Sequence, residues 1–291
     1  MNISKNAVPP QALRLITGPA KVTTYESTGG QVTQQFAQHN LGLIPSIGAG
    51  SIIHDNASGS GTVTRLILSN PTTPKDSVQI QATDIDQPFL DQLSADAASN
   101  AWPVTATNQR GESLSFADET FTHSITNIGI IFFTGAGLDG TKEIHRTLKP
   151  GGVAIVNCWE SVTWQPAIFA VHAHFRSKHP FPAPTTNWKD GKQIRKVMID
   201  AGFAEEKMKV ETSEAWAKVG GGEDGFRAWV EKTWAYLAGI AGWFPDDERD
   251  WDEEVDMLAK VLRSYGEEQG VKVVGDEVWL RASQWVVVAE K

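Results

Sequence analysis

The chain is poor in cysteine, in long apolar runs and in clustered positive charge. Cys158 is the only cysteine among 291 residues, so no disulfide can form within the chain. No run of about 18 apolar residues occurs, so the sequence predicts no transmembrane helix. Residues 1–13 also lack the apolar segment of a secretory signal. We therefore expect a cytoplasmic protein that is stabilised by a hydrophobic core rather than by cross-links.

Negative charge exceeds positive charge. The chain has 26 Lys and Arg residues against 35 Asp and Glu residues, a formal net charge of -9. Because an acidic surface repels a phosphate backbone, nucleic acid is not an expected partner. The histidines and the cysteine do not have the spacing of metal ligands, so we expect no metal site.

Short β-branched segments alternate with segments of helical periodicity over the first half of the chain. This alternation predicts an α/β fold, which is Rossmann-like and doubly wound, with a mostly parallel seven-stranded sheet. The expected strands are residues 51–55, 78–82, 102–106, 123–128, 153–156 and 207–212, with a final hairpin or strand pair at 277–288. The expected helices are residues 62–68, 86–98, 138–148, 191–202, 223–243 and 247–269.

A glycine-rich turn follows the first expected strand. It contains Asp55, Gly59 and Gly61, and glycines allow a backbone to bend sharply and to approach a ligand closely. Asp84 ends the next expected strand, where a carboxylate can accept hydrogen bonds from both hydroxyls of a ribose. The alternative for Asp84 is a helix N-cap, and that role fits Asp86 better.

The surroundings of these glycines separate two classes of cofactor. A dinucleotide fingerprint requires another glycine three residues after Gly61, where this chain has Thr64. Asp55 would repel a pyrophosphate, whereas it would attract a cationic amino acid that carries a sulfonium. The turn therefore favours an adenosyl sulfonium over a dinucleotide.

Three elements in this order resemble the motifs of class I S-adenosylmethionine-dependent methyltransferases. They are the pattern Asp55-x-x-x-Gly59-x-Gly61, the acid Asp84 and the later run at residues 148–152. The resemblance covers residues 50–160 and is closest to fungal small-molecule methyltransferases of secondary metabolism, including the gliotoxin-type thiol methyltransferases. It implies S-adenosylmethionine as cofactor and methyl transfer to an oxygen, sulfur or nitrogen of a natural product. It also implies a small-molecule substrate and no nucleic-acid or membrane partner.

The resemblance also implies roles for individual residues. Asp55, Gly59 and Gly61 would shape the site for the methionine part, with Ala57 in place of the usual first glycine. The other implied cofactor contacts are Asp84 on the ribose, Ile85 on the adenine, Asn108 with Gln109 near the adenine amino group, and Asn127 beside the transferable methyl.

Residues beyond the core are candidates for catalysis and substrate binding. His172 and His174 could act as a general base, because histidine titrates near neutrality; a structural histidine is the alternative for each. Trp159, Trp164 and Trp188 could line a substrate pocket, and core packing is the alternative.

The expected domains follow from these assignments. Residues 1–45 would form an N-terminal helical arm over the cofactor site, which begins as a loose arm over residues 1–20. Residues 46–160 would form the cofactor-binding core. Residues 161–291 would supply C-terminal insertions that form a helical substrate cap, with loop and short helix over 160–190, and the last strands of the sheet. Two functional alternatives remain open: a cofactor-bound protein that catalyses a rearrangement or cyclisation, and a regulatory partner protein of the same fold.

Overall fold

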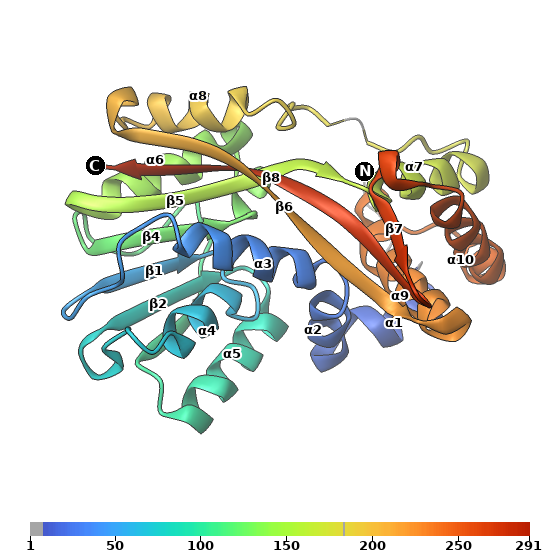
Figure 1. The fold of residues 1–291 in the computed structure, drawn as a ribbon, viewed down its shortest axis with the longest axis horizontal. Helices are drawn as coiled ribbons and strands as arrows, with labels where there is room; N and C mark the ends of the chain where they lie inside the picture. Colours follow the sequence, from blue (N-terminus) through green and yellow to red (C-terminus); the bar gives the residue numbers. More distant parts are fainter. Residues whose placement is uncertain (1–7, 183) are drawn as a thin grey trace. The chain divides into compact units, whose positions relative to one another are not determined.

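The computed structural model describes residues 8–182 and 184–291 of the chain (Figure 1). Its strands are β1 (Ile52–Asn56), β2 (Gln79–Asp84), β3 (Val104–Asn108), β4 (Phe121–Asn127), β5 (Leu148–Val162), β6 (Met208–Gly221), β7 (Val271–Val274) and β8 (Glu277–Glu290). Its α-helices are α1 (Pro10–Ile16), α2 (Gly18–Glu26), α3 (Gly30–Leu41), α4 (Thr62–Ser69), α5 (Gln87–Asn100), α6 (Leu138–Thr147), α7 (Trp164–Phe175), α8 (Lys192–Asp200), α9 (Gly222–Leu237) and α10 (Asp247–Arg263).

The strands form one mixed sheet in the order β3-β2-β1-β4-β5-β8-β6, with β7 paired to β8. The five strands from β3 to β5 run parallel to one another, and β7 runs antiparallel to β8. The predicted α/β fold with a mostly parallel, Rossmann-like sheet is confirmed.

The chain folds into two compact units that are each discontinuous in sequence. The core unit comprises residues 33–161, 185–214 and 283–291, and the helical unit comprises residues 1–32, 162–184 and 215–282. The division predicted from the sequence, into residues 1–45, 46–160 and 161–291, concerns the cofactor and the substrate and stays a prediction.

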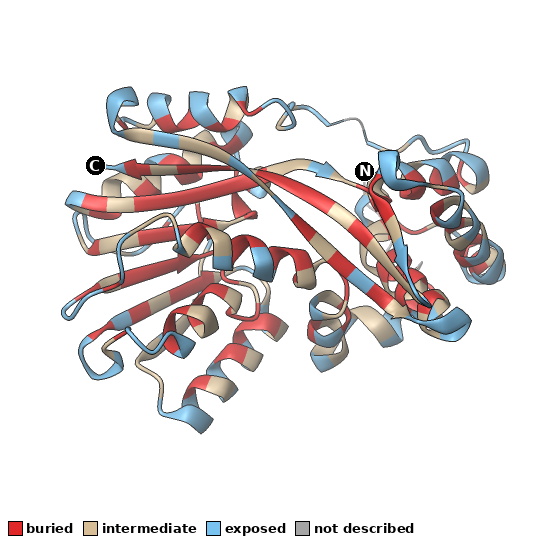
Figure 2. Cartoon of the chain, in the orientation of Figure 1, coloured by how far each residue is buried: buried red, intermediate tan, exposed pale blue. Residues whose placement is uncertain are grey.

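Helices cover both faces of the sheet in the core unit. Successive strand residues point to opposite faces, so Ala154 and Val156 pack with α6 and α8, whereas Ile155 packs with α3 and α4. Figure 2 shows the resulting buried bands along β1, β4 and β5. Because both faces are covered, even polar residues of these strands are buried, including His54, Ser124 and Thr126.

The helical unit is built around large aromatic side chains. α9 packs against α1, α2 and α10, and α10 packs against α7. Phe226, Trp234 and Trp251 are fully buried among these helices. Core packing is therefore the role of several of the tryptophans in the second half of the chain.

Three segments differ from the sequence prediction. Residues 10–16 and 18–20 are helical rather than a loose arm, because Pro10 and Pro19 stand in the first turn of α1 and α2, where proline is tolerated. Residues 164–175 form one regular helix, α7, which the nearby prolines and histidines obscured. Residues 277–290 form one strand rather than a hairpin; the hairpin lies between β7 and β8.

Every helix within the described residues is too short or too polar to cross a lipid bilayer.

Candidate cofactor site

The order of the strands reverses at β1, which lies between β2 and β4. In an open parallel sheet, a crevice forms at such a reversal, outside the carboxyl ends of the strands, and ligands bind there. Asn56, Asp84, Asn108 and Asn127 are the last residues of β1 to β4, so their side chains share this edge. The sheet therefore gathers most of the predicted cofactor residues at one place.

The loop of residues 57–61 joins β1 to α4 and turns sharply. Ala57, Gly59 and Gly61 all have positive φ angles, of 54°, 53° and 91°. At Gly61 a Cβ would lie 2.4 Å from Leu93 Cδ1, so close packing on α5 also requires glycine. Ala57 adopts the same backbone region at a cost of about 1–2 kcal/mol, which explains why a glycine is usual there.

Asp84 ties this loop to the end of β2. Its Oδ2 accepts a hydrogen bond of 2.8 Å from the backbone N–H of Gly59, and its Oδ1 accepts one of 2.9 Å from the N–H of Asp86. Burial raises the pKa of Asp84, while these backbone donors lower it. Asp86 is the N-cap residue of α5, but its side chain makes no capping hydrogen bond.

Asp55, in β1, is buried, and its side chain reaches the first turn of α4. Its Oδ2 accepts hydrogen bonds from the backbone N–H and from the hydroxyl of Thr64, at 3.0 and 2.6 Å. Its Oδ1 has no hydrogen-bond partner among the described residues. Burial raises the pKa of Asp55 to about 7, against the lowering effect of the two bonds from Thr64. The carboxyl group thus keeps one unpaired acceptor.

The turn after β2 contacts the end of β3. Asn108 donates from Nδ2 to the carbonyl of Ile85 at 3.1 Å, and Gln109 donates its backbone N–H to the carbonyl of Asp84 at 3.0 Å. Ile85 is 60% exposed. An exposed apolar side chain between Asp84 and Asn108 is suited to pack against the flat face of a base.

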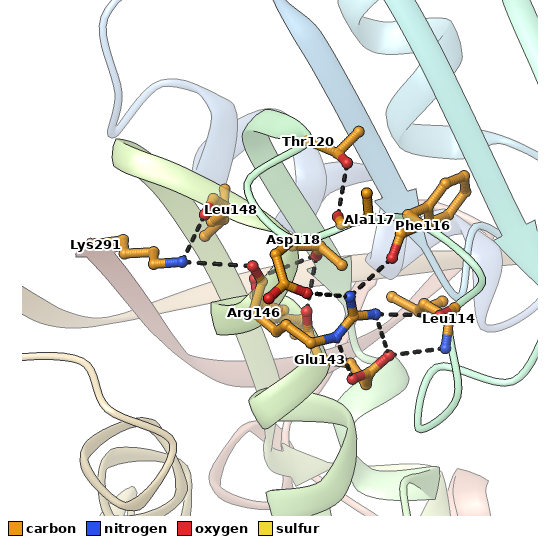
Figure 3. Close-up of polar contacts among 11 residues, drawn as sticks. Leu114, Phe116, Ala117, Asp118, Thr120, Glu143, Arg146, Leu148 and Lys291 are labelled. Carbon is orange, nitrogen blue, oxygen red and sulfur yellow. Dashed lines mark hydrogen bonds and ion pairs between the residues drawn. The ribbon is translucent and has the colours of Figure 1, made fainter.

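An arginine on α6 fixes the loop between β3 and β4 (Figure 3). Arg146 donates to the carbonyls of Leu114 and Phe116 at 3.1 and 2.8 Å, and it pairs with Glu143 and Asp118. The Arg146 guanidinium lowers the pKa of Glu143, whose Oε2 in turn accepts the N–H of Leu114.

The same loop reaches Gln109. Gln109 Oε1 accepts the backbone N–H of Ser115 at 2.8 Å. Since Ser115 lies between the two carbonyls that Arg146 holds, this ion-pair network also restrains the side chain of Gln109. No role for Arg146 or Glu143 was predicted from the sequence.

Asn127 ends β4 and is already engaged within the protein. Its Nδ2 donates to the carbonyl of Thr33 at 2.9 Å, and its Oδ1 accepts a bond of 3.0 Å from Asn157 of β5. Asn157 is fully buried and was missed in the sequence analysis. Its only signal was a polar residue inside an otherwise apolar strand.

The three predicted pocket tryptophans divide between the units. Trp159 and Trp188 belong to the core unit: Trp159 packs its ring against Phe36 at 5.7 Å, and Trp188 packs against Gly137. Trp164 belongs to the helical unit, where it is buried edge-on against Trp229. The packing of Trp164 therefore favours the core alternative for this residue.

Both candidate bases lie on α7, in the helical unit. His172 is buried and its Nε2 lies 2.5 Å from the carbonyl oxygen of His179, so this nitrogen carries the proton. Burial lowers its pKa, and Nδ1 has no hydrogen-bond partner within the part of the chain that the structure describes. His174 is exposed and contacts the ring of Phe175. The geometry favours a structural role for His172, and the catalytic role of either histidine stays a prediction.

Residues 53–152 match the family model described as a methyltransferase domain. This segment is therefore similar to a methyltransferase domain. It contains β1 to β4, the loop of residues 57–61, and Asp84, so the match falls on the edge of the sheet described above. It confirms the predicted enzyme class and the predicted cofactor, S-adenosylmethionine. No curated protein matches the chain by sequence.

Solved structures of known proteins share the fold of this chain. A candidate methyltransferase of Bacillus halodurans has 18% identity and a TM-score of 0.55, over 87% of this chain and 98% of that one. The phosphoethanolamine N-methyltransferase 2 of Haemonchus contortus, in complex with S-adenosyl-L-methionine, has 15% identity and a TM-score of 0.56, over 98% of this chain and 60% of that one. The [4+2]-cyclase SpnF has 15% identity and a TM-score of 0.52, over 89% of this chain and 81% of that one.

Proposed function

We propose that this protein is a cytoplasmic enzyme that transfers the methyl group of S-adenosylmethionine to an oxygen, sulfur or nitrogen of a small-molecule natural product. The resemblance to fungal enzymes of secondary metabolism supports this choice of acceptor class. The observation that carries the proposal is the bond from the Gly59 N–H to Asp84 Oδ2, because it joins the glycine-rich loop and the end of β2 into one cradle.

The residues of this cradle fit the cofactor. Each oxygen of Asp84 accepts one backbone N–H, and a carboxylate oxygen has capacity for a further donor such as a ribose hydroxyl. A Cβ placed on Gly59 would meet no atom within 4 Å, so the loop leaves open space above it. The Oδ1 of Asp55, which has no partner among the described residues, is an acceptor that could pair with a methionine ammonium.

The cofactor supplies an electrophilic methyl group, and the protein aligns and shields it. Asp84 and the N–H groups of the loop hold the two ends of the cradle in a fixed geometry, which is the main contribution a protein makes to an in-line displacement. Asn108 and Ile85 would read the adenine, with Gln109 beside them, and Asn127 would border the methyl group.

Residues for the acceptor are part of the proposal too. Trp159 and Trp188 of the core unit would line the substrate pocket. A base would remove a proton from an acceptor that is protonated at neutral pH, and His172 and His174 stay predictions for this role. A thiol, hydroxyl or phenol would need such a base, whereas a neutral amine would not.

Isothermal calorimetry with S-adenosylmethionine tests the cradle. Asp84→Ala should weaken binding by about 1.5–3 kcal/mol, because hydrogen bonds to a charged group are lost. Asp86→Ala is the matched control, two residues away, and should change the affinity little. Equal affinities of the Asp84→Ala variant and the wild type would overturn the ribose role.

The same preparation separates methyl transfer from other chemistry on this fold. Incubation with labelled cofactor and a panel of thiols, phenols and amines should release S-adenosylhomocysteine. Tight cofactor binding without any release would favour a rearrangement or cyclisation. A stable protein partner recovered with an inactive chain would favour a regulatory role.

A further inference from the structure

A network of neutral amide side chains lies buried at the carboxyl end of β4, beside the middle of β5. Asn40, Asn157 and Gln284 are each at most 1% exposed, and they come from α3, β5 and β8 of the core unit. Burying an amide group is costly unless it is hydrogen-bonded, so such a cluster needs a physical reason.

The network is satisfied at its centre. Asn157 donates from Nδ2 to the side-chain oxygens of Asn127 and Gln284. Gln284 donates from Nε2 to Asn40 at 2.8 Å and to Ser213 at 2.7 Å, and it also accepts from Asn40. Fully paired networks of this kind are rigid and define one arrangement of the groups that they join.

Asn157 holds a strained turn at the end of β4. Its Oδ1 accepts the backbone N–H of Ile128 at 2.9 Å. Ile128 has φ 67° and ψ -18°, a left-handed conformation that a β-branched residue rarely adopts. Strained backbone of this kind persists only where the surroundings impose it, and it gathers at functional sites.

This turn lies directly against the glycine-rich loop. A Cβ placed on Gly129 would lie 2.4 Å from the Cβ of Ala57, so the backbone of Gly129 is in close contact with that methyl group. Ala57 is itself left-handed, with φ 54°. A continuous path of contacts thus runs from Asn157 through Ile128 and Gly129 to Ala57.

We propose that Asn157 is a positioning residue: it holds the Ile128–Gly129 turn in contact with Ala57 and thereby fixes the conformation of the loop of residues 57–61. The proposal rests on the proposed function, because the loop is the part of the cradle that binds S-adenosylmethionine. This position requires an acceptor for the Ile128 N–H and two donors, one for Asn127 and one for Gln284. An amide supplies all three without carrying a charge.

The test compares Asn157→Ala with a matched loss elsewhere in the core unit. Thr147 on α6 is fully buried, and its hydroxyl donates to the carbonyl of Glu143 at 2.8 Å. Thr147→Val therefore removes a buried hydrogen bond far from the cofactor loop. Calorimetry with S-adenosylmethionine should show about tenfold weaker binding for Asn157→Ala. Thr147→Val should bind as the wild type does, although both variants lower the melting temperature.

A double-mutant cycle checks the path of contacts. Ala57→Gly removes the methyl group through which the turn touches the loop, so in this background Asn157→Ala should weaken binding by only about threefold or less. A fold-change of the same size in both backgrounds would overturn the proposal. If Asn157→Ala does not fold, Asn157→Asp replaces it in the test. Asn157→Asp keeps an acceptor for the Ile128 N–H, so it should keep part of the affinity for S-adenosylmethionine.

A second measurement is independent of the cofactor. Hydrogen exchange of the Ile128 amide should be slow in the wild type and in Asn157→Asp, and much faster in Asn157→Ala. If the wild type does not bind S-adenosylmethionine, the proposed function fails. The positioning role of Asn157 is then decided by the exchange rate of the Ile128 amide alone, and equal rates in the wild type and in Asn157→Ala would overturn it.

Discussion

Both units bury carboxyl groups, but they compensate them differently. In the core unit, Asp55 receives one N–H and one hydroxyl from Thr64 and keeps an unpaired oxygen. In the helical unit, Asp247 accepts a bond of 3.0 Å from the guanidinium of Arg176, and Glu254 lies 3.5 Å from the same group. The first acid has no cation of the protein in contact with it among the described ion pairs, and the other two share one.

Arg176 is also enclosed by aromatic rings. Its guanidinium carbon lies 4.9 Å from the ring centre of Trp234, 5.3 Å from that of Trp243 and 5.4 Å from that of Phe244. Side chains of Arg176, Asp247 and Glu254 are at most 2% exposed. A buried arginine that is paired with carboxyl groups of the protein and enclosed by aromatic rings has a structural role. A buried carboxyl group without such a partner, such as Asp55, is suited to pair with a cationic group of a ligand.

The largest expected effect comes from removing the built-in cation. Arg176→Met should lower the free energy of unfolding by about 3–5 kcal/mol, because it leaves two buried carboxyl groups without their partner. Arg227→Met is the control: Arg227 pairs with Asp252 and Asp256, but all three side chains are exposed, so its loss should cost about 1 kcal/mol or less. Similar urea denaturation curves for the two variants would show that the buried cluster is not structural.

The second effect separates the two acids by their ligand. Asp55→Asn keeps an oxygen for Thr64 but cannot carry charge, so it should weaken S-adenosylmethionine binding by about 1.5–3 kcal/mol. Its unfolding free energy should change by less than about 1 kcal/mol. Asp247→Asn should show the reverse pattern, with a clear loss of stability. Calorimetry and denaturation of both variants decide this, and a matching pattern in the two would contradict the comparison.

The third effect is on the pH dependence of stability. Burial raises the pKa of Glu254 to about 7 and also raises the pKa of Asp247. The folded chain therefore keeps protons that the unfolded chain releases above the ordinary pKa of 4.5, and the unfolding free energy should fall as the pH rises from about 4.5 to about 7.

Glu254→Gln should reduce that slope, and Asp55→Asn should reduce it further, since burial raises the pKa of Asp55 to about 7 as well. Urea titrations at pH 5 and pH 7.5 measure the change. A wild-type protein that is more stable at the higher pH would contradict the expected sign.

The smallest expected effect is a gain in stability at the cofactor loop. Ala57→Gly should raise the unfolding free energy by up to about 1 kcal/mol, because glycine relieves the left-handed strain at φ 54° while losing some of this gain in the unfolded state. Ala101 offers a comparison, since it is also left-handed, at φ 50°, but it follows the last residue of α5, at the opposite end of that helix from Asp84. Thermal melts of Ala57→Gly and Ala101→Gly should both shift upward, and a drop for Ala57→Gly would mean that its methyl packing outweighs the strain.

The core of the sheet could be predicted from the sequence because local signals agree there. β1, β2 and β4 are buried β-branched segments, and each ends in a polar residue at the same edge. The glycines and Asp84 lie within about 30 residues of one another, so their contact follows from one βαβ unit. Apolar periodicity and turn chemistry were sufficient for this part of the fold.

Other parts depend on contacts between distant residues, which spacing does not reveal. Asn157 meets Gln284 and Asn127 only because β4, β5 and β8 are neighbours in the sheet. Arg176 meets Asp247 across 71 residues of chain. The prolines near residue 10 suggested an arm because the sequence alone does not show that they occupy first turns of helices.

The single cysteine of the chain has a practical consequence. Cys158 is buried in β5, its thiol donates to the carbonyl of Trp188 at 3.7 Å, and burial raises its pKa to about 12. Because alkylating reagents attack the thiolate, this residue should stay unlabelled in the folded protein at neutral pH. A cysteine introduced at an exposed position could then carry a fluorophore or spin label as the sole reactive group, with the native background left intact.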